Sequence, residues 1–252
     1  MTSRTDIGAG PDAHRPGQWW VMTKGSIEAI NAIDPETTRA VVARPTSVAL
    51  GGWPGSTVGR AWASCAKFSS DLDSGAISPE VGAVMYDPEG WEATPLDERR
   101  DPITSIRAFG GLGRRAGYFV IVTPHPGLVD VPGSTLNRAA EESRETAYLR
   151  SSITFVAARV ADACEIQAQR FQSDPETYRE IVSQAAEQAR AANPDVLVLS
   201  GLSTHPGYRA TWNMLFDAWA SVRDVVDGHY LSLARLRHPQ VAARFLRAVT
   251  RR

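Results

Sequence analysis

Two acidic side chains stand close together in the run 84–91, Val-Met-Tyr-Asp-Pro-Glu-Gly-Trp. Asp87 and Glu89 are two residues apart, so on an extended strand they face the same side, with Cα atoms roughly 7 Å apart. Two carboxyl groups in a partly closed pocket repel one another, so one is expected to keep its proton near neutral pH while the other is ionised. Such a pair supplies a general acid and a general base. The alternative is that Asp87 caps a helix or pairs with an arginine.

A second polar pattern occurs in the run 164–170, Cys-Glu-Ile-Gln-Ala-Gln-Arg. If this run is a strand, Glu165, Gln167 and Gln169 share one face, and the small apolar residues share the other. A side-chain amide can orient a substrate oxygen or a carboxylate, so we expect Gln167 and Gln169 to bind substrate. For Glu165 and Gln167 the alternative is a structural layer of hydrogen bonds.

Two segments of similar sequence each place a histidine after an apolar run. They are 123–127, Thr-Pro-His-Pro-Gly, and 203–207, Ser-Thr-His-Pro-Gly. Imidazole titrates near neutral pH, so we expect His125 to act in acid–base catalysis and His205 to contact substrate, with simple exposure as the alternative. Neither His-x-His nor His-Glu-x-x-His occurs, so the sequence predicts no metal site.

Aromatic residues follow several of the short apolar runs. In loops at strand ends such residues form the apolar wall of a pocket, and we expect this role for Trp53, Trp91 and Tyr230. Trp212, Phe216 and Trp219 are instead spaced as on one face of a helix, which predicts a place in the core.

To act together, these residues need a fold in which the ends of several strands meet. The sequence alternates short apolar runs, which are typical of strands, with longer amphipathic ones, which are typical of helices. Asp-Pro pairs open two of the helices and Gly or Asn-Pro closes them. The predicted strands cover 19–22, 47–50, 83–86, 118–122, 164–168, 196–199 and 229–233, with one more expected within 135–158. The predicted helices cover 103–115, 177–192, 210–222 and 239–249.

Strict alternation of strand and helix predicts an α/β protein that forms a single TIM-type (β/α)8 barrel. The barrel is expected to be regular, irregular or lacking one strand. A doubly wound sheet is the alternative, but it needs a glycine-rich phosphate loop after a strand. The glycines at 111 and 113 lie late in a predicted helix, so we expect no nucleotide and no other cofactor. Residues 1–18 are expected to form a flexible tail and residues 19–252 the catalytic barrel.

Composition narrows the class of protein further. The chain has 252 residues, 43% of them hydrophobic, and a formal net charge of −1, which argues against binding nucleic acid by neutralising phosphates. It has two cysteines and no apolar run long enough to cross a membrane. The first 18 residues lack the apolar core of a secretory signal, so a cytoplasmic location is expected. Only two of the 27 basic residues are lysines, so catalysis is expected to fall to carboxylates and histidine.

The run that ends at Glu89 resembles the chitinase-like glycoside hydrolases, whose motif is Asp-x-x-Asp-x-Asp-x-Glu. Glu89 and Asp87 match the last two acidic positions, whereas Met85 and Gly82 replace the earlier two. The resemblance implies that Glu89 donates a proton and that Asp87 orients a substrate acetamido group. The chain also resembles uncharacterised actinobacterial barrel proteins with a Tyr-Asp-x-Glu-x-Trp strand end, a resemblance that implies no activity.

The residues themselves favour a different substrate. We expect an acid–base barrel enzyme, a lyase or cyclase, that catalyses dehydration, addition or cyclisation of a neutral small metabolite of secondary metabolism. Glu89 would protonate the leaving hydroxyl, and Asp87 or His125 would remove a proton. A glycoside hydrolase and a non-catalytic binding barrel are the alternatives, and the oligomeric state stays open.

Overall fold

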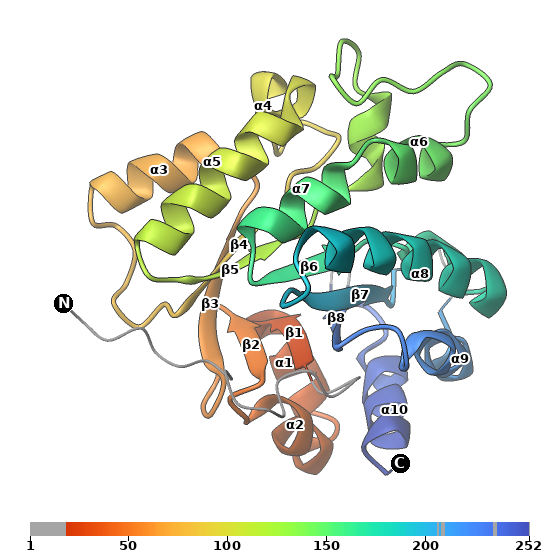
Figure 1. Ribbon diagram of the computed structural model, residues 1–252. Helices are drawn as coiled ribbons and strands as arrows, with labels where there is room; N and C mark the ends of the chain where they lie inside the picture. The colour runs from red at the N-terminus through yellow and green to blue at the C-terminus, as the bar shows by residue number, and fades with distance from the viewer. Residues whose placement is uncertain (1–18, 206, 208–209, 234–235, 252) are drawn as a thin grey trace. The chain divides into compact units, whose positions relative to one another are not determined.

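The computed structural model describes residues 19–205, 207, 210–233 and 236–251, and the predicted tail at 1–18 lies outside these residues (Figure 1). Eight strands form a closed barrel in chain order, which confirms the (β/α)8 fold. Pairing is parallel along β1–β2–β3, β4–β5–β6 and β7–β8–β1. The strands are β1 Trp19–Thr23, β2 Ser47–Leu50, β3 Thr57–Trp62, β4 Ala83–Tyr86, β5 Phe119–Val122, β6 Ala163–Ile166, β7 Leu197–Ser203 and β8 Gly228–Ser232.

Ten α-helices are described between and after the strands. They are α1 Lys24–Asn31, α2 Pro35–Val42, α3 Cys65–Asp73, α4 Leu96–Arg100, α5 Pro102–Arg115, α6 Arg144–Arg150, α7 Ile153–Val160, α8 Pro175–Ala192, α9 Trp212–Val222 and α10 Pro239–Thr250. No helix within the described part of the chain has the length and apolar character needed to cross a membrane.

Strands β2 and β4 are buried on both faces. All of their residues are buried, which explains why these two segments are continuous runs rather than alternations of apolar residues. On β4 the ring of Tyr86 stacks on Phe109 of α5, with centroids 4.8 Å apart. Tyr86 therefore faces the helices, and its neighbours on the strand face the barrel interior.

Two predictions about the elements are wrong. The region 135–158 contains no strand; it holds α6 and most of α7. The missing strand is β3, whose sequence Thr-Val-Gly-Arg-Ala-Trp has neither an apolar run nor a clean alternation. Gly59 is required there, because a Cβ atom would lie 2.6 Å from Val48 of the adjacent strand.

The described residues group into two compact units. One comprises 60–167 and 184–198, and the other comprises 19–59, 168–183 and 199–251. In the first unit α5 packs between α3 and α7, and in the second α10 packs against α1, α2 and α9 (Figure 1). The candidate acid–base residues all belong to the first unit.

Candidate active site

Asp87 directly follows β4, and its side chain is held by the next two strands. Thr123, directly after β5, donates its hydroxyl to Asp87 Oδ1 at 2.7 Å. Gln167, directly after β6, donates its amide to the same oxygen at 3.1 Å and to the Thr123 carbonyl at 2.8 Å. The three strand ends thus hold the carboxyl group through one oxygen, and no hydrogen bond from a described residue occupies Oδ2.

Glu89 lies two residues further along the same loop. Its backbone N–H donates to Thr94 Oγ1 at 2.8 Å, which fixes the main chain. Its Oε2 atom is buried and has no hydrogen-bond partner among the described residues. Burial, followed by the nearby charge of Asp87, raises the pKa of Glu89 to about 9.

The two carboxyl groups therefore differ in the hydrogen bonds that are donated to them. Burial also raises the pKa of Asp87, but the hydrogen bonds from Thr123 and Gln167 act in the opposite direction. Donated hydrogen bonds stabilise a carboxylate, and Glu89 receives none at Oε2. The hydrogen bonds to Asp87 favour its ionised form, whereas Glu89, with a pKa of about 9, keeps its proton at neutral pH.

His125 lies close to Glu89, with 3.9 Å between its Nδ1 and Glu89 Oε2. Its Nδ1 accepts the N–H of Gly127 at 2.9 Å, so the hydrogen of the neutral ring is on Nε2. Burial, together with the positive charge of Arg144, lowers the pKa of His125 to about 4. At neutral pH both His125 and Glu89 are uncharged, so the pair is not a salt bridge, and His125 offers a donor rather than a base.

Trp91 extends this group toward solvent. Its indole meets the His125 ring edge-on, with centroids 4.9 Å apart, and it is 52% exposed. The loops that carry the two rings touch at two glycines: a Cβ on Gly90 would lie 2.9 Å from the Gly127 carbonyl oxygen. The close approach of these backbones keeps the ring pair beside Glu89.

A third carboxyl group, that of Glu165, is buried in the same unit. Burial is the largest cause that raises its pKa well above the usual value, and the charges of Asp87 and Glu89 add to it. Two residues further along, directly after β6, Gln167 donates a hydrogen bond to Asp87. Thr123 is a residue of the site that was not predicted; its position directly after an apolar strand is the signal that could have indicated it.

The remaining predicted substrate contacts belong to the second unit. Gln169 is not on a strand with Gln167: β6 ends at Ile166, and Gln169 begins a short 3-10 helix, so the prediction of a continuous strand face is wrong. Trp53 lies in the turn after β2, where its carbonyl accepts the Ser56 hydroxyl at 2.8 Å. These residues stay predictions as substrate contacts.

His205 and Tyr230 are also in that unit. His205 Nδ1 accepts the N–H of Gly207 at 3.0 Å, the same turn that His125 forms with Gly127. On β8 the neighbouring His229 packs on Trp20, with ring centroids 5.3 Å apart, and also lies beside Trp219 of α9. His229 therefore faces the helices, and Tyr230 faces the other side of the strand.

Within the described residues, no cluster of three or more His, Cys, Asp and Glu side chains has an arrangement suited to a metal ion. What the first unit does offer is a protonated carboxyl group, a hydrogen-bonded carboxylate, an imidazole N–H and an exposed indole. Such a set can donate a proton, accept a proton and position a neutral substrate.

Comparison with known proteins adds little to this geometry. No protein-family profile and no curated protein matches the sequence. Among solved structures, the barrel is similar to a candidate alpha-L-fucosidase from Bacteroides thetaiotaomicron, with a TM-score of 0.46 and 11% identity. The match covers 73% of this chain and spans 60% of that protein. A likeness of this extent concerns the backbone and not the reaction.

Proposed function

We propose that this protein is an acid–base enzyme that cleaves or forms a carbon–oxygen bond in a neutral, hydroxyl-bearing small molecule. The proposal is supported by the contrast between Glu89 Oε2, which is buried and has no hydrogen-bond partner among the described residues, and Asp87 Oδ1, which accepts two side-chain hydrogen bonds. Keeping both groups buried is costly, and the difference between them is the one that general acid–base catalysis requires.

In a dehydration, Asp87 removes a proton from the carbon next to the one that bears the hydroxyl group. The electrons left behind form the new carbon–carbon double bond as the carbon–oxygen bond breaks. The departing oxygen takes the proton of Glu89 and leaves as water. Addition is the reverse of this sequence, and cyclisation replaces water by a hydroxyl group of the same substrate. In this proposal the Nε2–H of His125 donates a hydrogen bond to a substrate oxygen, a role supported by the Gly127 N–H that occupies its Nδ1.

The exposed indole of Trp91 supports a second candidate, a glycoside hydrolase. An accessible indole face beside a proton donor is suited to packing on the apolar face of a sugar ring. In that reaction Glu89 gives its proton to the glycosidic oxygen, and water completes the cleavage. The resemblance of the Asp87–Glu89 segment to chitinase-like enzymes implies the same role for Glu89.

The experiment compares four variants on two panels of substrates. β-Hydroxycarbonyl compounds report dehydration through the absorbance of the conjugated product, and 4-nitrophenyl glycosides report hydrolysis through nitrophenolate. Glu89→Gln and Asp87→Asn are expected to lower turnover by about a hundredfold or more, as loss of a general acid or base does. Glu92→Gln and Asp97→Asn neutralise exposed acids nearby and serve as matched controls.

The same variants test the proposal without a substrate. Carbon-13 NMR of the carboxyl groups should show protonated glutamate signals at pH 7, and the signal of Glu89 should be the one that disappears in Glu89→Gln, while that of buried Glu165 remains. A Glu89 that is ionised at pH 7 would overturn the proposed function, and so would full turnover in both site variants.

A further inference from the structure

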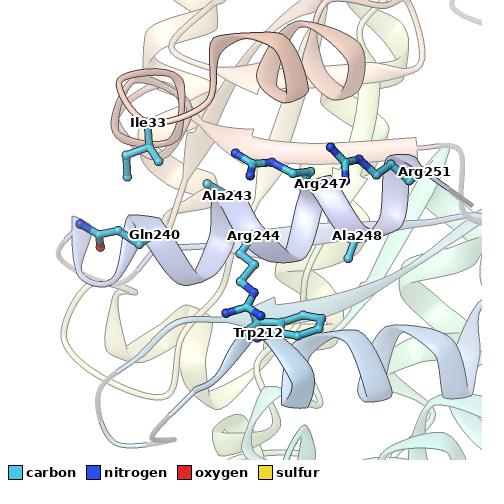
Figure 2. A pocket seen from close by; sticks show the side chains of 8 residues that line it. All are labelled: Ile33, Trp212, Gln240, Ala243, Arg244, Arg247, Ala248 and Arg251. Carbon is cyan, nitrogen blue, oxygen red and sulfur yellow. The ribbon is translucent and has the colours of Figure 1, made fainter.

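A groove on the outer face of α10 belongs to the second unit, shares no residue with the acid–base site and has a different chemistry. It has a volume of about 420 Å³ and is lined by α10, the start of α9 and the segment between α1 and α2 (Figure 2). Ile33, Ala243 and Ala248 supply apolar surface, and charge comes from two arginines of α10, Arg244 and Arg247, and from Arg251, which directly follows the helix. This volume is within the range of small-molecule sites.

Arg244 is held in a way that leaves its donors available. Its guanidinium carbon lies 4.3 Å above the centre of the Trp212 ring, and Figure 2 shows the two side chains stacked on one flank of α10. Stacking uses the flat face of the guanidinium, whereas its N–H groups lie around the edge. No carboxylate of the described residues pairs with Arg244, so these donors can bind an anion.

Arg247, on the opposite flank of the helix, is held by Asp34. Its Nη2 and Nε atoms lie 2.7 and 2.8 Å from Asp34 Oδ2. The other oxygen of Asp34 accepts the N–H of Thr37 at the start of α2, so the carboxylate is itself fixed. Arg251 follows one turn later on the same flank (Figure 2). Among the described residues, Asp34 is the one carboxylate that pairs with these three guanidinium groups, which leaves two positive charges, those of Arg244 and Arg251, without an ion-pair partner there.

We propose that this groove binds an organic phosphate monoester, with the phosphate between the arginines and the apolar body against Ile33 and Trp212. A phosphate monoester is close to a dianion at neutral pH, which matches the two excess charges. Guanidinium groups bind phosphate oxygens through paired N–H donors. Arginines near a helix C-terminus also stabilise the helix dipole, but that explanation does not require Arg244 to stack on Trp212.

The experiment uses phenyl phosphate as the probe and inorganic phosphate and benzyl alcohol as comparison ligands. Each is titrated into the intact protein while the indole N–H signal of Trp212 is followed by NMR, after assignment with Trp212→Phe. Phenyl phosphate is expected to shift this signal saturably and to bind about tenfold more weakly to Arg244→Gln, the loss of one charge-assisted contact. Arg114→Gln, which removes an exposed arginine on α5, is the matched control and should bind normally.

Three outcomes would overturn the proposal. The first is no saturable shift of Trp212. The second is equal binding by the wild type and Arg244→Gln. The third is binding of inorganic phosphate as tight as that of phenyl phosphate, because the apolar surface would then contribute nothing. None of these outcomes bears on the turnover of Glu89 and Asp87 variants, so the two proposals fail separately.

Discussion

The side-chain amide of Gln167 donates to Asp87 Oδ1 at 3.1 Å, although 80 residues separate the two along the chain. The contact exists because β4 and β6 both pair with β5, which brings their carboxyl ends to one edge of the sheet. Thr123 at the end of β5 completes the arrangement. The charge on Asp87 is therefore maintained by side chains from two other strands.

Removing one of these donors should weaken catalysis without removing a catalytic group. Thr123→Val keeps the shape of the side chain but loses the hydroxyl, and a hydrogen bond to a charged group contributes about 1.5–3 kcal/mol. We expect turnover to fall by about 10- to 100-fold and the acidic limb of the pH–rate profile to move to higher pH, because the pKa of Asp87 rises. Thr123→Ser retains the hydroxyl and should retain the profile.

The alkaline limb of the same profile should report Glu89. Its pKa is raised to about 9, so the protonated form is present at neutral pH and is lost as pH rises through that value. Activity is expected to fall accordingly. A profile that falls near pH 5 instead would show that Glu89 acts in its ionised form.

Glu89→Gln should stabilise the protein while it abolishes turnover. The pKa of Glu89 in the folded state is raised above the usual 4.5, so the folded state binds the proton more tightly than the unfolded state does. The free energy of unfolding therefore falls as the pH rises from about 4.5 to about 9. Glutamine has no such dependence. We expect urea unfolding at pH 8 to show a gain of about 1–3 kcal/mol that vanishes at pH 4. A loss of stability at pH 8 would contradict the buried neutral acid.

His229 should make the fold sensitive to acid. Burial lowers its pKa to about 3; its Nδ1 lies 2.9 Å from Ser200 Oγ, and its Nε2 is buried without a partner among the described residues. In the unfolded state the imidazole takes up a proton near pH 6.5, whereas in the folded state it does so only near pH 3. The free energy of unfolding is therefore unaffected above pH 6.5 and falls by about 1.4 kcal/mol per pH unit between pH 6.5 and pH 3. In urea unfolding at several pH values, His229→Gln should remove this contribution to the slope of unfolding free energy against pH, which corresponds to about one proton. Substitution of the exposed His238 by Gln should leave the slope unchanged.

Glu98 should be important for stability rather than for activity. Its carboxylate accepts the N–H groups of Cys65 and Ala66 at the start of α3, at 2.7 and 3.0 Å, and the hydroxyl of Tyr86 at 2.8 Å. Glu98→Ala leaves these buried donors unpaired, with an expected cost of about 3–5 kcal/mol in thermal or urea unfolding. Tyr86→Phe removes only one bond and should cost about 1 kcal/mol. Equal stability of Glu98→Ala and wild type would contradict this role.

The sequence was sufficient for β2 and β4, whose residues are buried on both faces. The bounds of β2 and β4 agree with the predicted runs because continuous burial leaves a continuous apolar signal. β3 was missed because Gly59 and Arg60 interrupt its pattern, and the glycine is set by contact with Val48, which no local pattern reveals. β6 was predicted too long because alternation continues past Ile166, where the backbone turns into a 3-10 helix.

The residue types of the site could also be predicted, but their states could not. Alternation placed Asp87 and Gln167 on inward faces, and the hydrogen bond between them agrees with that placement. The hydrogen bond from Thr123 to Asp87 depends on how β4, β5 and β6 are aligned, which no local sequence pattern reveals. The donor role of His125 depends on the Gly127 N–H that occupies its Nδ1, a feature of backbone conformation.

The two compact units interleave along the chain. The chain enters the first unit at 60, leaves it at 168, returns at 184 and leaves again at 199. Neither unit is therefore a contiguous segment, and no single cut in the coding sequence would yield a fragment that contains one complete unit and none of the other. The barrel must consequently be expressed, permuted or recombined with other proteins as a whole, and the acid–base residues cannot be transplanted as an excised half-barrel.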